Sequence, residues 1–151
     1  MEDALNQLVE GGCRCGASRY KLSVEKAPAV YCCHCHYCQS WSGSAFTQQA
    51  VVPSAALAAT GPIVEYAYNT DSGSTSTHRF CATCHTRLFN DNTRLPGYFI
   101  VRAGTFDDSH LVEPRAHIWT KRKQPWIAIP DDIPTWEENA PAVDFIALVL
   151  G

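Results

Sequence analysis

The sequence has no long apolar run and almost no clustered basic charge. None of its 151 residues belongs to a stretch approaching the roughly 20 apolar residues of a membrane-spanning helix. The net charge is -3, and the one basic run is Lys121–Lys123. Nucleic-acid binding normally requires a basic face, so the charge distribution argues against a nucleic-acid partner. The lack of a long apolar run argues against membrane insertion.

A secretory signal is also missing from the beginning of the sequence. The segment MEDALNQLVEGG carries Glu2 and Asp3 early and contains no apolar signal core. We therefore expect a cytoplasmic protein whose thiols stay reduced. The length, the 46% apolar content and the 18% charged content are typical of one globular domain.

Cysteine, by contrast, is abundant and clustered. Seven of the eight cysteines fall into three close sets: Cys13-x-Cys15, Cys33-x-Cys35-x-x-Cys38 and Cys81-x-x-Cys84. Spacings this short strain or forbid disulfides within a set, whereas they suit thiolates that converge on one metal ion. The sequence therefore predicts metal binding and not a disulfide framework.

Short alternating apolar segments separated by turn residues predict an all-β fold, sandwich-like or rolled. The expected strands are 17–24, 29–33, 44–52, 63–69, 76–80, 86–91, 97–104, 115–120 and 126–130. The segment 70–75, rich in Gly, Ser and Asp, predicts a hairpin between two of them. Short helical turns are expected in 1–10 and 53–60, and an extended segment is expected from Pro130, with 143–150 undecided.

Two cysteine sets lie at the ends of expected strands. Cys13 and Cys15 precede the first strand, whereas Cys81 and Cys84 follow the strand 76–80. A tight turn between strands aims both sulfurs in one direction, as in a zinc knuckle, and two such turns can supply four thiolates to a tetrahedral zinc ion. We predict that these four cysteines form a structural zinc site, which can contribute on the order of 10 kcal/mol to folding.

The middle set supplies three thiolates, Cys33, Cys35 and Cys38. Three protein ligands suit a catalytic zinc with an open position, whereas a structural zinc needs a fourth. Residue chemistry alone supports both readings equally. Cys32 is expected in the core, because adjacent strand residues point to opposite faces, and His34 is expected to turn away. A closed site could be completed by Cys32, His34, His36, His78, His85, His110 or His117.

Four segments, GGCRCGASRY, CHCHYCQSWSGSAF, RFCATCHTRLF and HIWTKRKQPWIAIPDDIPTW, resemble the glutathione-dependent formaldehyde-activating enzyme family, which includes the centromere protein V type domain. The resemblance covers 9–136 and leaves 137–151 as a C-terminal tail. It implies a β-tent-like fold of short antiparallel strands with zinc knuckles. It also implies a structural zinc at Cys13, Cys15, Cys81 and Cys84, and a labile, catalytic zinc at Cys33, Cys35 and Cys38.

The activity that this resemblance implies is zinc-dependent carbon–sulfur lyase chemistry on glutathione–aldehyde adducts such as S-(hydroxymethyl)glutathione, with glutathione as co-substrate. The alternative is a non-catalytic binding module stabilised by zinc. His85 stands where the family usually has glycine, so we expect a left-handed backbone there. Candidate groups for the carboxylates of glutathione are Arg14, Arg79, Arg87, Arg102 and Lys121, and candidate pocket aromatics are Trp119 and Trp126.

Overall fold

The computed structural model describes residues 7–150, which form two β-sheets and two α-helices. The strands are β1 (Gln7–Gly12), β2 (Arg19–Val24), β3 (Val30–Cys33), β4 (Thr47–Pro53), β5 (Leu57–Thr60), β6 (Ile63–Asn69), β7 (Thr75–Cys81), β8 (Arg87–Asn92), β9 (Tyr98–Arg102) and β10 (Pro114–Ile118). The α-helices are α1 (His36–Ser42) and α2 (Ala142–Leu150), and the 3₁₀ helices are η2 (Ser54–Ala56), η3 (Ala103–Thr105), η4 (Ser109–Leu111) and η5 (Thr120–Arg122). Within the described residues, no helix is long and apolar enough to cross a membrane.

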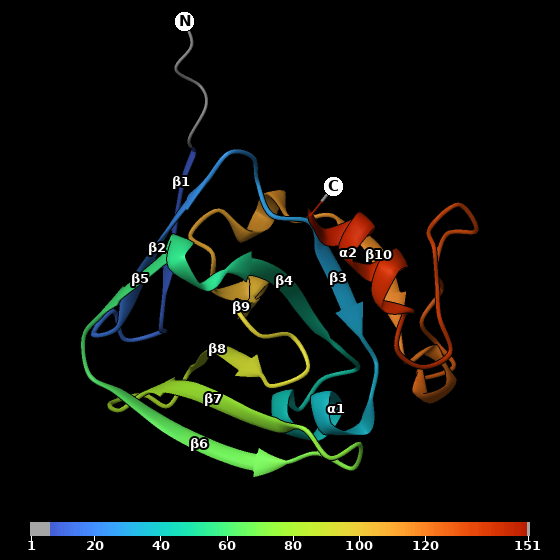
Figure 1. The fold of residues 1–151 in the computed structure, drawn as a ribbon, viewed down its shortest axis with the longest axis horizontal. Helices are drawn as coiled ribbons and strands as arrows, with labels where there is room; N and C mark the ends of the chain where they lie inside the picture. The colour runs from blue at the N-terminus through green and yellow to red at the C-terminus, as the bar shows by residue number, and fades with distance from the viewer. Residues whose placement is uncertain (1–6, 151) are drawn as a thin grey trace, which may run out of the picture.

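The strands are arranged as a tent-like shell. A three-stranded sheet has the order β1-β2-β5, and a seven-stranded sheet has the order β10-β3-β4-β9-β8-β7-β6. Every pair is antiparallel except β10 with β3, which run parallel. Figure 1 shows a three-sided outline, with β1, β2 and β5 on one side, β6 to β8 along the base, and β3, β10 and α2 on the third side. This arrangement confirms the expected all-β class.

The first hydrophobic core lies between the two sheets. Tyr20 and Leu22 of β2 are 1% and 0% exposed, and they pack with Leu88 of β8 and Val101 of β9 in one cluster. The alternation predicted for β2 is therefore confirmed, since Lys21 between them and Ser23 after them are exposed.

A second core lies on the opposite face of the large sheet, beneath α2. Ala50 and Val52 of β4 face the first core, whereas Val51 faces the second. On that side Tyr31 packs edge-on against Phe145 of α2, with ring centroids 5.1 Å apart and an interplanar angle of 80°. Burial on both faces explains why β4 carries a continuous apolar run.

Several local predictions need correction. Residues 126–130 form no strand, because a hydrogen bond from Ile127 N–H to Gln124 O at 3.1 Å closes a turn there, Pro125 precedes the segment and Pro130 ends it. Gln7–Gly12 is strand β1 instead of a helical turn, since it pairs along its whole length with β2; residues 1–6 lie outside the described residues. The turn expected in 53–60 is only η2, followed by β5, and α1 was not predicted.

Candidate metal centres and active site

Four cysteines from two distant turns bring their sulfurs together at one end of the molecule. The Sγ atoms of Cys13 and Cys15 are 3.6 Å apart, and those of Cys15 and Cys81 are 3.8 Å apart. Cys84 completes the group, in which all four sulfurs lie within 4.8 Å of one another. A tetrahedron with zinc–sulfur bonds of about 2.3 Å has edges of about 3.8 Å, so this donor set fits a closed zinc site.

Backbone geometry in the two turns supports these thiolates. Ser18 N–H donates to Cys13 Sγ at 3.3 Å, and Cys84 N–H donates to Cys81 Sγ at 3.5 Å. The hydroxyl of Thr86 lies 3.1 Å from Cys84 Sγ and lowers the pKa of that thiol to about 5. Hydrogen bonds to a thiolate favour its charged form, which is the form that binds metal.

His85 closes the second turn in the conformation expected of it. Its φ is 64°, in the left-handed region, and its N–H donates to Cys81 O at 2.8 Å. The side chain is exposed. The prediction made from the missing glycine is therefore confirmed, and a histidine here holds a backbone shape that glycine adopts freely.

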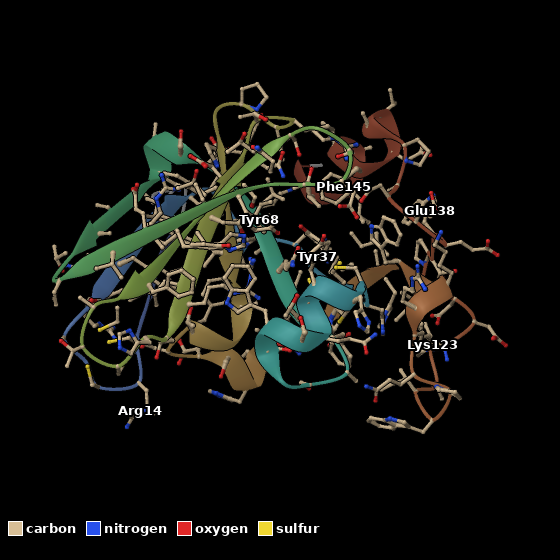
Figure 2. All side chains as sticks on the ribbon, turned by 90° about the horizontal axis from the view of Figure 1, so that it is seen from below. Arg14, Tyr37, Tyr68, Lys123, Glu138 and Phe145 are labelled. Atoms are coloured by element: carbon tan, nitrogen blue, oxygen red, sulfur yellow. The ribbon has the colours of Figure 1, made fainter. Side chains whose placement is uncertain are left out.

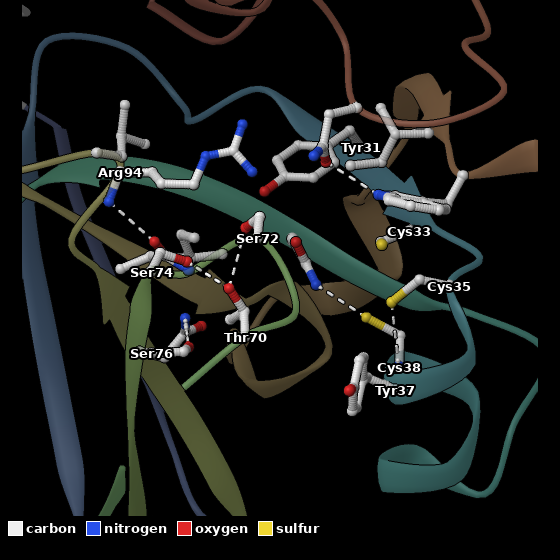
Figure 3. A pocket seen from close by; sticks show the side chains of 18 of the residues that line it. Tyr31, Cys33, Cys35, Tyr37, Cys38, Thr70, Ser72, Ser74, Ser76 and Arg94 are labelled. Atoms are coloured by element: carbon white, nitrogen blue, oxygen red, sulfur yellow. Dashed lines mark hydrogen bonds between the residues drawn. The ribbon is translucent and has the colours of Figure 1, made fainter. Parts of the chain in front are cut away.

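The second group of sulfurs lies where β3 joins α1. Cys33 ends β3, Cys35 is the N-cap of α1, and Cys38 lies in the first turn of that helix. Cys38 N–H donates to Cys35 Sγ at 3.4 Å, which satisfies one of the free donors of the helix terminus. The three sulfurs lie within 4.8 Å of one another and point into a common space in Figure 3.

Hydrogen bonding concentrates negative charge on one member of this trio. Contacts from Cys33 and Cys35 hold the pKa of the Cys38 thiol well below its usual range, whereas contacts with Cys35 and Cys38 raise the pKa of Cys33. The amide of Gln49 on β4 also donates to Cys38 Sγ at 3.4 Å. The trio therefore favours a thiolate, and three thiol donors around an open corner suit zinc.

No further ligand atom joins the trio among residues 7–150. Cys32 is 0% exposed and, by strand alternation, lies on the other face of β3. His34 is also fully buried; its Nε2 lies 2.8 Å from His117 Nδ1, and burial lowers its pKa to about 4. The other histidines named as possible fourth ligands, His36, His78, His85 and His110, likewise stay outside the group.

The trio lines a cavity of about 590 Å³. One wall is aromatic: Trp41 and His78 stack with centroids 4.3 Å apart, and Tyr68 stacks on His78 at 5.6 Å. In Figure 2, Tyr68 and Tyr37 lie at the centre of the molecule, with Phe145 beyond them. A cavity with an aromatic wall and a cluster of thiols suits an organic ligand that reacts through sulfur.

The turn between β6 and β7 forms a polar rim of this cavity. Thr70 Oγ1 lies 3.0 Å from Ser72 Oγ and 2.6 Å from Ser74 Oγ, as Figure 3 shows. Trp119 also lines the cavity. Trp126 does not, because its side chain is 73% exposed in the turn after η5, so its expected role as a pocket residue is wrong.

The five basic residues proposed for carboxylate binding separate clearly. Arg14 is exposed beside the four-cysteine group, and in Figure 2 it lies far from Tyr37 and Tyr68, which line the cavity. Arg79 pairs with Glu65 and Asp91, and Lys121 pairs with Glu138. Arg87 and Arg102 both line the cavity and, within residues 7–150, make no ion pair.

Burial lowers the pKa values of both arginines. It lowers the pKa of Arg87 to about 9, and the neighbouring guanidinium of Arg102 adds to the effect. It also lowers the pKa of Arg102. Both side chains remain cationic at neutral pH, because a guanidinium group is effectively always protonated in a protein.

Sequence reasoning missed several cavity residues. Gln49, Ser76 and Asn90 are polar side chains buried on strands, and nothing in their local pattern distinguishes them from outward-facing residues. The helix α2 was left undecided, although Pro141 directly before it is a recognised start signal. The order of the strands in the large sheet brings Gln49, Ser76 and Asn90 to the cavity that the three thiols line.

The sequence profile of the family described as glutathione-dependent formaldehyde-activating enzyme matches residues 8–122. The chain belongs to this family. It is also 29% identical, over 97 residues, to a protein of Schizosaccharomyces pombe named an uncharacterized lyase; the match covers 64% of this chain and 67% of that protein.

A crystal structure of a Rhodobacter sphaeroides protein has a similar fold, with a TM-score of 0.54 and 20% identity. It covers 70% of this chain and 92% of that one. Both cysteine groups of this glutathione-dependent formaldehyde-activating enzyme family member lie inside the region 8–122, whereas α2, which lines the cavity, lies outside it.

Proposed function

We propose that this protein is a zinc-dependent carbon–sulfur lyase that makes or breaks adducts of glutathione with an aldehyde, of the S-(hydroxymethyl)glutathione type. Membership of the family and the lyase name of the yeast relative support this class of activity. The observation that carries the proposal is the trio Cys33, Cys35 and Cys38, whose sulfurs converge at the wall of a cavity with no fourth donor among the described residues.

In this proposal the two cysteine groups differ in role. Cys13, Cys15, Cys81 and Cys84 hold a structural zinc that joins the start of the domain to β7 and β8. Cys33, Cys35 and Cys38 hold a second, exchangeable zinc and form the catalytic group. A zinc ion with an open position can lower the pKa of a bound thiol and polarise a carbonyl oxygen.

The chain itself would position the reactants. Adduct formation joins the thiol sulfur to the carbonyl carbon and moves the thiol proton to the carbonyl oxygen; cleavage reverses both changes. Binding at the trio would place the thiol sulfur of the substrate at the cavity wall. The stacked side chains of Trp41 and His78 would limit the space beside that sulfur. His36 is exposed, begins α1 and lines the cavity, so we assign it the exchange of this proton with solvent.

The domain assignment and the location follow from the same proposal. We propose that residues 9–136 form the zinc-binding domain and that 137–151 is a tail whose helix α2 covers the cavity. We further propose that the protein acts in the cytoplasm, where glutathione is abundant and thiols stay reduced, on a small molecule and not on nucleic acid.

The proposal is tested by measuring zinc per chain and the rate of glutathione–formaldehyde exchange, by magnetisation-transfer NMR, in wild type and in Cys35→Ser. We expect about two zinc ions in wild type and about one in the variant, together with loss of the enzyme-dependent exchange. Cys32→Ser is the matched control, because its buried sulfur lies outside both groups, and it should keep both zinc ions.

Two outcomes would count against the proposal. If exchange is equally fast in wild type and Cys35→Ser, the trio does not perform the chemistry. If wild type holds both zinc ions tightly, and glutathione changes neither zinc content nor exchange rate, the protein is a zinc-stabilised binding module.

A further inference from the structure

Two arginines that line the cavity, the buried Arg102 and the half-buried Arg87, have no acidic partner among the described residues. Arg102 of β9 is only 7% exposed, and its one hydrogen bond to a described residue runs from Nη1 to Ile100 O at 3.3 Å. Arg87 of β8 lies with its guanidinium 4.5 Å from the ring centroid of Trp41. Both arginines and Trp41 also form a wall of a second cavity, of about 610 Å³.

The formal charges of the proposed zinc site and of the two arginines do not cancel. Three thiolates with one bound zinc ion carry a single negative charge, whereas the two guanidinium groups carry two positive charges. His78, which lies beside them, stays neutral, since burial lowers its pKa to about 3. The inner cavity therefore has one excess positive charge, and a buried charge without a counter-ion is costly.

The remaining charged side chains do not supply that counter-ion. Asp71 is the one acidic residue among the described residues that line either cavity. It is exposed at the polar rim, where its carboxylate accepts a hydrogen bond from Tyr37 Oη at 3.3 Å. The other charged residues lining the main cavity, Arg94, Lys121 and Arg122, are cationic.

Three buried polar atoms of the cavity wall also lack partners. Arg102 Nε, His78 Nδ1 and Asn90 Oδ1 form no hydrogen bond within the described residues, although all three side chains line the main cavity. Ser76 links the last two, with its Oγ 2.9 Å from His78 Nε2 and accepting from Asn90 Nδ2 at 3.1 Å. Buried polar atoms are nearly always paired. Arg102 Nε–H is a donor and therefore needs an acceptor from a ligand, whereas Asn90 Oδ1 is an acceptor and needs a donor.

We propose that Arg87 and Arg102 form a carboxylate subsite at the inner part of the cavity, so that the thiols accepted by the trio are those that carry a carboxylate. A guanidinium presents a planar set of donors that matches a carboxylate. The guanidinium of Arg87 lies over the ring of Trp41, and the strands β8 and β9 fix both arginines in the sheet. This proposal rests on the proposed function for the binding of the substrate thiol at the trio and for the identity of the full substrate.

The test uses small probes and requires no turnover. Zinc-loaded protein is titrated at constant ionic strength with 3-mercaptopropionate and with its uncharged amide, and then with propionate, which has no thiol. Binding is followed by calorimetry and by the NMR signal of the Arg102 Nε–H group. We expect the acid to bind at least about tenfold more tightly than the amide, and we expect propionate to shift the Arg102 signal.

Arg87→Gln should remove most of this preference, reducing the affinity for 3-mercaptopropionate at least about tenfold. Arg94→Gln is the matched control: it removes the same charge from an exposed position of the cavity rim, so screening should keep the affinity within about twofold of wild type. Arg102→Lys tests the buried arginine while keeping its charge, and it should weaken binding because one ammonium cannot reproduce the planar set of donors.

Equal binding of acid and amide, or full affinity in Arg87→Gln, would overturn the proposal and would mean that the arginines only balance the charge of the trio. Unfolding and zinc content are measured for each variant, and the NMR shift in wild type decides the question if Arg102→Lys fails to fold. If small carboxylates bind but glutathione adducts are not converted, the proposed function fails and the subsite stands. If adducts are converted equally well by wild type and Arg87→Gln, the subsite fails and the proposed function stands.

Discussion

Replacing His85 with glycine should stabilise the protein, although the substitution removes a side chain. His85 has a φ of 64° and an exposed side chain that forms no hydrogen bond or ion pair with the described residues. Two backbone hydrogen bonds close this turn, from His85 N–H to Cys81 O at 2.8 Å and from Cys81 N–H to Thr86 O at 3.0 Å, and glycine retains both. The substitution therefore changes mainly the cost of the left-handed backbone.

The size of the effect follows from two opposing contributions. A side chain with a Cβ atom costs about 1–2 kcal/mol in the left-handed region. Glycine costs about 0.5–1 kcal/mol through the larger conformational entropy of the unfolded chain. The net gain for His85→Gly is about 0–1.5 kcal/mol, which for a chain of this length corresponds to an increase in Tm of about 0–6 °C.

The assay is thermal unfolding of the zinc-loaded protein followed by circular dichroism. His85→Ala is the matched control, because alanine removes the imidazole and keeps the Cβ atom; its stability should stay within about 0.5 kcal/mol of wild type. If His85→Ala gained as much stability as His85→Gly, the stabilisation would come from removing the imidazole and not from relieving the backbone. A lower Tm in His85→Gly would refute the assignment of strain to this backbone.

Three further predictions concern other parts of the molecule. Cys81→Ser should lose one zinc ion and the folded state, as measured by zinc analysis and circular dichroism, because structural zinc contributes on the order of 10 kcal/mol; a folded Cys81→Ser protein would contradict this role. Burial lowers the pKa of His78 from 6.5 to about 3, so the unfolded chain gains a proton first and stability is lost as the pH falls below about 6.5. His78→Gln should therefore lose less stability than wild type between pH 7 and pH 5 in urea unfolding, and identical losses would show that His78 is not responsible. Phe145→Ala should destabilise the protein by about 1–3 kcal/mol and weaken ligand binding by opening the cavity wall beside Tyr31, and unchanged unfolding and affinity would mean that α2 does not close the cavity.

Local sequence patterns predicted the strands and the grouping of the thiols. The alternation of Tyr20 and Leu22 gave β2 its buried face, and the cysteine spacings anticipated both sulfur groups. Such predictions succeed because the period of a strand and the reach of a tight turn are local properties. The segment 126–130 misled for the same reason: it has the apolar residues of a strand but no neighbouring strand with which to pair.

Long-range geometry was beyond local patterns. Arg87 and Arg102 meet because β8 pairs with β9 in the register that sets Phe89 opposite Val101. No spacing rule distinguishes these arginines from Arg79, which forms two ion pairs. The short helix α1 was missed because its N-cap is a cysteine, Cys35, in place of the usual Ser, Thr, Asp or Asn.

The two sulfur groups differ in how much of the chain they need. Cys33, Cys35 and Cys38 come from one short stretch, whereas the other group joins thiols near residue 13 to thiols near residue 84. On the ribosome, all donors of the first group leave the exit tunnel on the order of seconds before those of the second are complete. If both groups bind zinc as proposed, a nascent chain therefore offers the three-thiol site to the cellular zinc supply first, and it binds the structural zinc ion only after the middle of the sequence has been made.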